Sequence, residues 1–386
     1  MVWYRALHFQ FINSIDQVPK GFWQQTKNGA DPFCNYHFLA ALEHSGSVSA
    51  ETGWLPHHLI AYQGDTPVGM LPLYKKNHSY GEYVFDFAWA EAYDRHGIDY
   101  YPKLINAIPF TPVTGPRLFS TELVDEKTLI AAMFAYLKQQ LPELNVSSIH
   151  SLFITETISQ VLRGQACKQR LSVQFQWFNR NYASFDDFTA QFTARRRKTV
   201  RKERAKIAAQ GIQIDRFHGA ALQSQQMDFF YHCYRQTYMK RSGHSGYLSK
   251  RFFENILENM TDNILLVIAS REQVPIAGAL YFFNQQQLCG RYWGAIEEAD
   301  ALHFECCYYQ GIEFCIEHNI DSFNPGTQGE HKILRGFEPI YCYSNHWLVD
   351  EQFQAAVGRF IDQETSGIHA YKQNAEQLLP FRKGND

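Results

Sequence analysis

The sequence lacks the motifs that mark several large enzyme classes. Its 386 residues contain no G-x-S-x-G, no H-E-x-x-H, no Walker loop and no dinucleotide-binding glycine fingerprint. These absences argue against a serine hydrolase with a nucleophile elbow, a zinc peptidase, a P-loop nucleotidase and a Rossmann oxidoreductase. The histidines are scattered without metal-ligand spacing, so we expect no metal site.

Paired cysteines and long apolar runs are also missing. The eight cysteines include no C-x-x-C, so we expect reduced, mostly buried thiols rather than a disulfide framework or a zinc site. No stretch approaches the ~18 consecutive apolar residues that cross a bilayer. The first residues do not join a charged segment to an apolar block, as a secretory signal does. We therefore expect a cytoplasmic protein without membrane insertion.

Charge is low overall but concentrated at one place. The formal net charge is −3, whereas residues 195–206 hold eight Lys or Arg against Glu203 alone, a local charge of +7. The rest of the chain therefore carries −3 − 7 = −10. A positive patch on an acidic protein is a specific feature, because it attracts phosphate-bearing ligands.

Length and internal similarity both predict two modules. The chain is 45% apolar and longer than a single hydrophobic core usually grows. Four segments of the first half recur in order in the second half at nearly one offset, for example 269 − 61 = 208 and 290 − 81 = 209. We predict a module at 1–183 and a second at 184–386, the latter preceded by a basic helix at 195–210. The paired segments are 58–61 with 266–269, 67–71 with 275–280, 81–83 with 290–292, and 100–101 with 308–309.

Strands and helices alternate along the chain, which predicts an α+β or α/β fold. Ser184 is a suitable N-cap for the first helix of the second module, and Gly211 is a suitable stop. The predicted helices of this module are 185–210, 227–240, 250–260, 303–318 and a tail from 352; the predicted strands are 263–270, 275–284, 288–295, 320–324 and 338–348.

This layout resembles the GNAT acyltransferase fold, and two such halves in one chain resemble the Fem-type peptidyltransferases. Those enzymes move amino acids from aminoacyl-tRNA onto a cell-wall precursor. The chain is most similar to the proteobacterial FemAB-like family described as peptidoglycan biosynthesis/recognition, and the similarity covers nearly its whole length. The matching segments are HSYGEYVFD (78–86), YPKL (101–104), PFTPVTGPR (109–117), RRKTVRKER (196–204), GRYWG (290–294) and QGEHK (328–332).

The segment 324–335 carries the first candidate site. A predicted strand enters a Pro-Gly-x-x-Gly turn that is followed by Glu330, His331 and Lys332. Aminolysis needs a base for the amine proton and donors for the tetrahedral oxyanion. Glu330 or His331 could supply the base, and Lys332 could supply the donor or hold a phosphate. The resemblance implies the same role, because Lys332 matches a lysine implicated in Fem-type catalysis. The alternative is an ordinary capped turn.

The basic helix carries the second candidate site. Its cations recur at helical spacing and form two adjacent stripes, which could bind the phosphates of a donor. Phe192, Val200 and Ile207 are expected to face the protein. The alternative is a solvated helix face. The predicted donor-binding residues are Arg196, Arg197, Lys198, Arg201, Lys202, Arg204 and, beyond the turn, Arg335.

Two further clusters are candidates for binding an acceptor. Glu305 and Tyr309 are four residues apart, so a hydrogen bond between them is possible, and Glu305 is a further catalytic candidate. A structural ion pair of Glu305 with Arg291 is the alternative. In the first half, acidic and aromatic residues could bind a cationic or sugar-bearing acceptor, or form a polar loop. The predicted acceptor residues are Tyr83, Glu82, Asp86, Arg291, Trp293 and Tyr309.

These patterns and the resemblance favour an acyl- or aminoacyl-transferase acting on an amine, with a cell-wall precursor as one acceptor. The donor is expected to be acyl-CoA or aminoacyl-tRNA, with no covalently bound cofactor. The glycine loop by which GNAT enzymes hold pyrophosphate is missing, and residues 293–298 are acidic where it would lie. The first alternative is therefore a non-catalytic protein that recognises a peptidoglycan fragment or a nucleotide-linked precursor. The second is RNA binding through the basic helix.

Overall fold

The computed structural model describes residues 7–27, 31–327 and 329–382, and it divides the chain into two units. Unit 1 comprises the described residues up to Ser172 together with Tyr341–His369. Unit 2 comprises Val173–Ile340 and the described residues from Ala370. This division differs from the expected boundary at 183/184, because the chain returns to unit 1 after leaving unit 2.

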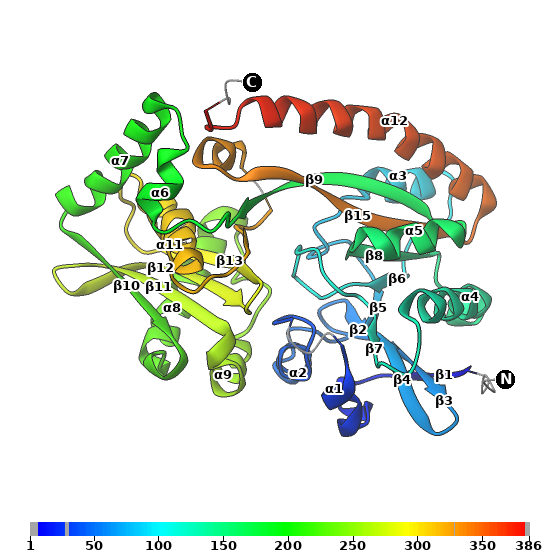
Figure 1. The fold of residues 1–386 in the computed structure, drawn as a ribbon. Helices are drawn as coiled ribbons and strands as arrows, with labels where there is room; N and C mark the ends of the chain where they lie inside the picture. Colours follow the sequence, from blue (N-terminus) through cyan, green and yellow to red (C-terminus); the bar gives the residue numbers. More distant parts are fainter. Residues whose placement is uncertain (1–6, 28–30, 328, 383–386) are drawn as a thin grey trace. The chain divides into compact units, whose positions relative to one another are not determined.

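Unit 1 is built from strands and helices that Figure 1 labels. Its elements are β1 (Leu7–Ile12), the 3-10 helix η1 (Ile15–Gln17), α1 (Lys20–Gln25), α2 (Tyr36–His44), β2 (Trp54–Pro56), β3 (His58–Gln63), β4 (Thr66–Leu71), β5 (Leu73–Lys76), α3 (Phe87–Arg95), β6 (Lys103–Asn106), β7 (Phe119–Ser120), α4 (Glu126–Leu144), β8 (Ser148–Ile154), α5 (Glu156–Gly164), the start of β9 (Lys168–Phe178) up to Ser172, β15 (Glu338–Leu348) from Tyr341, and α12 (Glu351–Gln377) up to His369.

Unit 2 follows the predicted order of elements closely. Strand β15 spans 338–348 as predicted, and each strand of the meander begins and ends within a residue or so of its predicted range. Its elements are β9 from Val173, α6 (Phe185–Ala190), α7 (Ala194–Ala209), β10 (Ile212–His218), α8 (Ser224–Ser242), α9 (Lys250–Asn259), β11 (Ile264–Arg271), β12 (Val274–Phe283), β13 (Gln287–Ala295), α10 (Leu302–Phe304), a π-helical turn (Glu305–Tyr309), α11 (Gln310–Glu317), β14 (Ser322–Asn324), the 3-10 helix η5 (Glu330–Arg335), the start of β15 up to Ile340 and the end of α12 from Ala370.

The two units share one order of strand pairing, as tandem modules of the predicted α+β type should. In unit 2, β10, β11, β12 and β13 pair antiparallel in sequence, β14 pairs parallel to β13, and β9 pairs antiparallel to β14. In unit 1, β1, β3 and β4 pair antiparallel, β5 pairs antiparallel to β6, β8 pairs parallel to β6, and β15 pairs antiparallel to β8. Pro72 lies between β4 and β5, where unit 2 has the single strand β12.

This topology corrects part of the predicted repeat. Strands β3 and β4 correspond to β11 and β12, as the first two matched segments predict. The third match is wrong, because residues 81–83 lie in the loop between β5 and α3, whereas residues 290–292 lie in β13. The fourth is also wrong, because residues 100–101 precede β6, whereas residues 308–309 lie in the π-helical turn. The segment between β5 and β6, which contains α3, is much longer than the turn between β12 and β13. Residues after β5 therefore no longer match unit 2 at the same sequence offset.

Each unit has its own hydrophobic core. In unit 1, the α4 side chains Leu129, Met133 and Leu137 are buried against strand residues such as Leu59 and Leu71. In unit 2, the core holds fully buried side chains from the meander, the helices that follow it and β9. Within the described ranges, no helix has the length and apolar content needed to span a lipid bilayer.

The packing of α8 on β13 leaves no room at Gly294. A Cβ atom there would lie 2.3 Å from the backbone carbonyl of Cys233. We expect Gly294→Ala to destabilise the protein by about 1–3 kcal/mol, because backbone cannot move as a side chain can. The measurement is the urea midpoint of unfolding. Gly367→Ala is the control: nothing lies within 4 Å of that α12 position, and alanine favours a helix there. Equal midpoints for the two variants would contradict this packing.

Candidate active site

The predicted turn after β14 is formed in unit 2. Gly326 has a φ of 92°, and its N–H donates to the Asn324 side chain at 2.9 Å. Only glycine adopts such a backbone readily, so the Pro-Gly pair reverses the chain here. Helix η5 then places Glu330, His331 and Lys332 in succession; Gln328, which belongs to the predicted turn, lies outside the described residues.

Lys332 is the buried member of this turn. Its side chain is 2% exposed, and its Nζ donates to the carbonyl oxygen of Gly326 at 2.6 Å. Burial lowers the pKa of the Lys332 amine to about 7, with only a weak opposing effect of Cys307. No carboxylate among the described residues forms an ion pair with it. The amine can therefore gain or lose a proton near neutral pH.

His331 and Glu330 face solvent beside it. The Nε2 of His331 lies 2.8 Å from the hydroxyl of Tyr308. Burial, Arg335 and Lys332 together lower the pKa of His331, so the imidazole is neutral at pH 7. Glu330 is exposed and accepts a hydrogen bond from the hydroxyl of Tyr371 at 3.0 Å. Of the predicted catalytic residues, His331 and Lys332 thus have an altered proton affinity; His331 is exposed, whereas Lys332 is buried.

Arg335 is held inside unit 2 rather than presented to a ligand. Its guanidinium bonds both carboxylate oxygens of Glu203, at 2.7 and 3.2 Å, and the hydroxyl of Tyr309 at 3.0 Å. The Tyr309 hydroxyl also donates to Glu203. A further Arg335 nitrogen donates to the carbonyl oxygen of His331 at 2.7 Å. Arg335 and Tyr309 are therefore parts of a polar network behind the turn.

Glu305 belongs to a second internal ion pair. It is 3% exposed and bonds Arg204 at 2.9 and 3.2 Å, and Arg204 also bonds Glu313. The predicted hydrogen bond between Glu305 and Tyr309 is wrong, because Tyr309 contacts Glu203 instead. The π-helical turn Glu305–Tyr309 explains this difference: its wider winding moves residues four apart off a common face.

The basic helix α7 presents most of its predicted cations outward. Val200 and Ile207 are buried, as is Phe192 just before the helix, which confirms the predicted inward face. Ser184 caps α6 as predicted, but the helix predicted at 185–210 is broken between α6 and α7. Lys198, Arg201 and Lys202 are exposed, and Arg196 and Arg197 are half-buried, whereas Arg204 points into the ion pair with Glu305.

Trp293 and Arg291 lie on β13, close to the same turn. The Trp293 ring packs edge-on against His303 at 5.5 Å between centroids, and His303 packs against Tyr308 at 5.3 Å. A continuous row of rings therefore leads from Trp293 to His331. Arg291 is the extra residue of a β-bulge in the pairing of β12 with β13.

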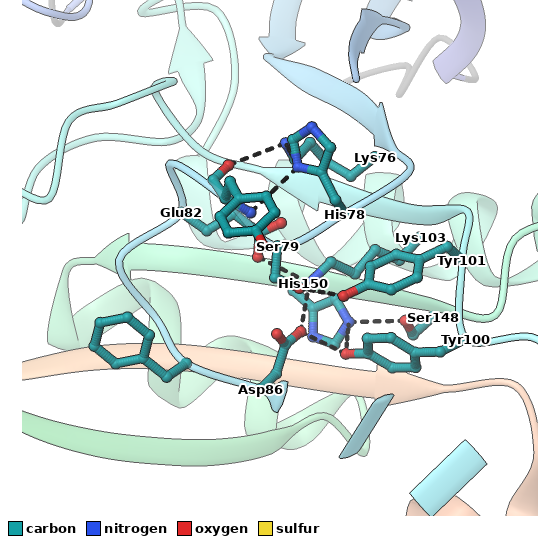
Figure 2. Close-up of polar contacts among 12 residues, drawn as sticks. Lys76, His78, Ser79, Glu82, Asp86, Tyr100, Tyr101, Lys103, Ser148 and His150 are labelled. Carbon is teal, nitrogen blue, oxygen red and sulfur yellow. Dashed lines mark hydrogen bonds and ion pairs between the residues drawn. The ribbon is translucent and has the colours of Figure 1, made fainter. Parts of the chain in front are cut away.

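Unit 1 holds a separate cluster around a lysine that the sequence analysis did not assign. Lys103, at the start of β6, is completely buried (Figure 2). Its Nζ donates to Glu82 at 2.8 Å, to Ser79 at 2.7 Å and to Asp86. The predicted acceptor residues Glu82 and Asp86 are thus brought together, but by a cation of the same chain. Tyr83 lies half-buried between them in the sequence, with a φ of 60°.

The cluster continues into a chain of hydrogen bonds that the sequence analysis also missed. The Tyr100 hydroxyl donates to Asp86 at 2.6 Å and lies 3.3 Å from His150 (Figure 2). The other ring nitrogen of His150 lies 2.6 Å from His346 on β15. The polar residues within these buried strands, unusual in such positions, were the available signal: Ser148, His150 and Ser151 on β8, and the consecutive Ser344, Asn345 and His346 on β15.

Burial and charge act in opposite directions on the acids of this cluster. Burial raises the pKa of Glu82 to about 7 despite the attraction of Lys103. For Asp86, the attraction of Lys103 and His150 outweighs burial and lowers the pKa to about 2. Burial also lowers the pKa of nearby Lys76 to about 7. Asp86 is therefore the permanent negative partner of Lys103.

Comparison with known proteins agrees with this architecture. The structure titled FemX has a TM-score of 0.54 at 12% identity and covers 90% of this chain and 100% of its own. A conserved protein of unknown function from Bacteroides thetaiotaomicron has a TM-score of 0.50 at 10% identity, covering 88% and 99%. A tandem GNAT protein from the clavulanic acid pathway has a TM-score of 0.49 at 10% identity, covering 89% and 99%. None of the curated proteins compared with the chain matches it.

Fold and site thus define a protein of two modules with a FemX-like fold. Residues 14–383 match the FemAB-like family, described as peptidoglycan biosynthesis/recognition, and the chain belongs to that family.

The raised pKa of Glu82 makes stability depend on pH. Its carboxyl binds a proton more tightly in the folded protein than when unfolded, where the pKa is 4.5. The stability it contributes is therefore complete below pH 4.5 and is lost as pH rises through about 7. Wild type loses this contribution on going from pH 4.5 to 8, and Glu82→Gln does not. The free energy of unfolding of Glu82→Gln, taken relative to that of wild type, should therefore increase by up to about 3 kcal/mol between these pH values.

Urea unfolding at both pH values measures this change. Glu91→Gln, at an exposed position of α3, is the matched control and should follow wild type. The assignment is refuted if Glu82→Gln and Glu91→Gln respond to pH in the same way.

Proposed function

We propose that the protein transfers an acyl or aminoacyl group from a phosphate-bearing donor to an amine of a cell-wall precursor. The observation that carries this proposal is the buried Lys332 amine, with a pKa of about 7, beside the accessible and neutral His331. Membership of the FemAB-like family supports the peptidoglycan precursor as acceptor.

The two residues supply the two functions that aminolysis needs. The acceptor nitrogen attacks the donor carbonyl carbon, and a new C–N bond forms as the bond to the oxygen or sulfur leaving group breaks. His331 takes the proton from the attacking amine, because its Nδ1 forms no hydrogen bond among the described residues. Lys332, as an ammonium, donates to the oxyanion of the tetrahedral intermediate. No covalent enzyme intermediate is required.

The exposed cations of α7 supply a site for the donor phosphates. Lys198 and Lys202 are one helical turn apart, exposed, and form no ion pair with another described residue. Their charge is therefore available to a ligand, in contrast to that of Arg204 and Arg335. Aminoacyl-tRNA and acyl-CoA both carry suitable phosphates, and either could serve as the donor.

The acceptor contacts closest to this chemistry are Trp293 and Arg291. The row of rings from the half-buried Trp293 and His303 to the buried Tyr308 ends at His331. Such a row can hold the stem of an acceptor side chain while its amine reaches the base. Tyr83, Glu82 and Asp86 stay predicted acceptor residues of unit 1, the two acids acting together with Lys103.

A recognition protein without catalysis is the second candidate. The fixed ion pairs of Glu305 and Arg335 favour it, because they withdraw two predicted site residues from direct chemistry. The family description also includes recognition. Binding of a muropeptide without consumption of any donor, unaffected by substitution of Lys332, would be its signature.

Substitution of Lys332 tests the transferase. We expect Lys332→Met to lower kcat by about 100- to 1,000-fold, because one oxyanion donor is lost. The assay follows transfer from radiolabelled aminoacyl-tRNA or acyl-CoA to nucleotide-linked muropeptides by mass spectrometry. Lys372→Met, at a lysine on α12 in an ion pair with Glu376, is the control and should keep wild-type turnover.

The pH profile provides a sharper test of the same residue. For wild type, kcat/KM should fall on the acid side as His331, whose pKa is lowered by burial, becomes protonated, and fall above about 7 as Lys332 loses its proton. Lys332→Arg should abolish the alkaline fall, because arginine stays charged. An unchanged alkaline limb in Lys332→Arg would show that Lys332 does not act as the cation.

Charge reversal on α7 tests the donor site. With aminoacyl-tRNA, Lys198→Glu/Lys202→Glu should weaken binding and reduce the slope of log K against log salt by about one for each phosphate contact. Filter binding at several salt concentrations measures the slope. Arg235→Glu/Lys240→Glu, on the exposed side of α8, makes the same change in net charge. A similar effect of both double variants would mean that only overall charge matters.

A further inference from the structure

Glu203 is the one carboxylate within the basic segment of α7, and it faces away from the exposed lysines. Its Oε1 and Oε2 accept from Arg335 at 2.7 and 3.2 Å, and its Oε2 also accepts from the hydroxyl of Tyr309. Burial raises the pKa of Tyr309, so that this group stays a neutral donor. Glu203 therefore receives donors from two other elements, η5 and the π-helical turn.

Arg335 connects Glu203 to the candidate catalytic turn, because it forms hydrogen bonds with both. It is 7% exposed, and its guanidinium lies 3.5 Å from the centre of the Phe304 ring. Its Nη1 donates to the carbonyl oxygen of His331 at 2.7 Å, which is the peptide group joining His331 to Lys332. A guanidinium fixed by a bidentate carboxylate has one preferred orientation. The position of this peptide thus depends on Glu203.

The attachment of α7 to its unit does not need Glu203. The neighbouring Arg204 bonds both Glu305 and Glu313, and Val200 and Ile207 are buried beneath the helix. Among the described residues, Glu203 is the only α7 side chain with an ion pair or hydrogen bond to η5. It therefore links the helix proposed to bind donor phosphates to the turn proposed to carry the chemistry.

We propose that Glu203 is a positioning residue, which fixes Arg335 and thereby holds His331 and Lys332 in the geometry for transfer. This inference rests on the proposed function for its effect on turnover. The contact itself is a property of the fold and has a measurable consequence without any substrate.

That consequence is electrostatic. Arg335 contributes to lowering the pKa of His331, and Glu203 offsets the charge of Arg335. When Glu203 is neutralised, the pKa of His331 should fall further, because the guanidinium is no longer balanced. The other titratable groups around His331 are His303, Tyr308 and Lys332, which the substitution leaves in place.

Three variants of the full chain test the proposal. Glu203→Gln removes the charge but keeps the shape, and Glu203→Asp keeps the charge on a shorter side chain. Glu317→Gln is the control, because it breaks a different ion pair of unit 2, with Arg216 at 2.9 Å. The measurements are kcat and KM for aminoacyl-tRNA, the His331 pKa from NMR titration of its ring protons, and the urea midpoint.

For Glu203→Gln, we expect kcat to fall roughly 10- to 100-fold with KM within about twofold, because a small misplacement is enough to slow transfer. The His331 pKa should fall as well. Glu203→Asp should recover most of the His331 pKa and part of kcat, and Glu317→Gln should alter neither.

The proposal is overturned if Glu203→Gln leaves the His331 pKa where Glu317→Gln leaves it, whatever happens to turnover. It is also overturned if kcat falls only in proportion to a loss of folded protein. If wild type transfers nothing from any donor, the proposed function fails, and the NMR titration alone then decides whether Glu203 controls the turn.

Discussion

A charged group buried away from water needs a partner of opposite charge, and both clusters of this protein depend on that constraint. Lys103 meets it with Asp86 and Glu82, so its pKa stays raised although the side chain is completely buried. Among the described residues, Lys332 has a peptide carbonyl and no carboxylate as partner, and its pKa falls to about 7. The same residue type is therefore structural in unit 1 and reactive in unit 2, and the difference is the number of carboxylates within reach.

The ion pairs behind η5 follow from the same constraint. Glu203, Glu305 and Glu313 neutralise Arg204 and Arg335 on the inner side of α7, whereas Lys198 and Lys202 on its outer side form no ion pair with a described residue. A helix with cations all round would repel itself and could not pack so closely. The inner acids thus make the outer positive surface compatible with a folded unit. The exposed cations of α7 and the turn that carries Lys332 are therefore connected through these inner ion pairs.

The sequence predicts the local elements well and the long-range contacts poorly. The strands of the meander follow from alternating apolar residues bounded by turns, and Ser184 follows from the chemistry of helix caps. The location of Lys332 in a turn after a strand was also predictable. The partners of Arg204 and Arg335 were not, because a run of charges shows how many cations there are and not where each side chain points. Lys103 meets acids about twenty residues earlier only through the folding of a loop, and the π-helical turn has no sequence signature.

Strand β15 gives the chain a particular order of assembly during synthesis. Its residues Tyr343 to Leu348 pair with β8 of unit 1, almost two hundred positions earlier, for example His346 opposite His150. While the ribosome is still making unit 2, β8 has no neighbour on that side and exposes unpaired backbone groups. Unit 1 is therefore finished last although it is made first. A nascent chain of this kind keeps an open sheet edge throughout the interval between the synthesis of β8 and that of β15, a state in which binding by a chaperone would protect it.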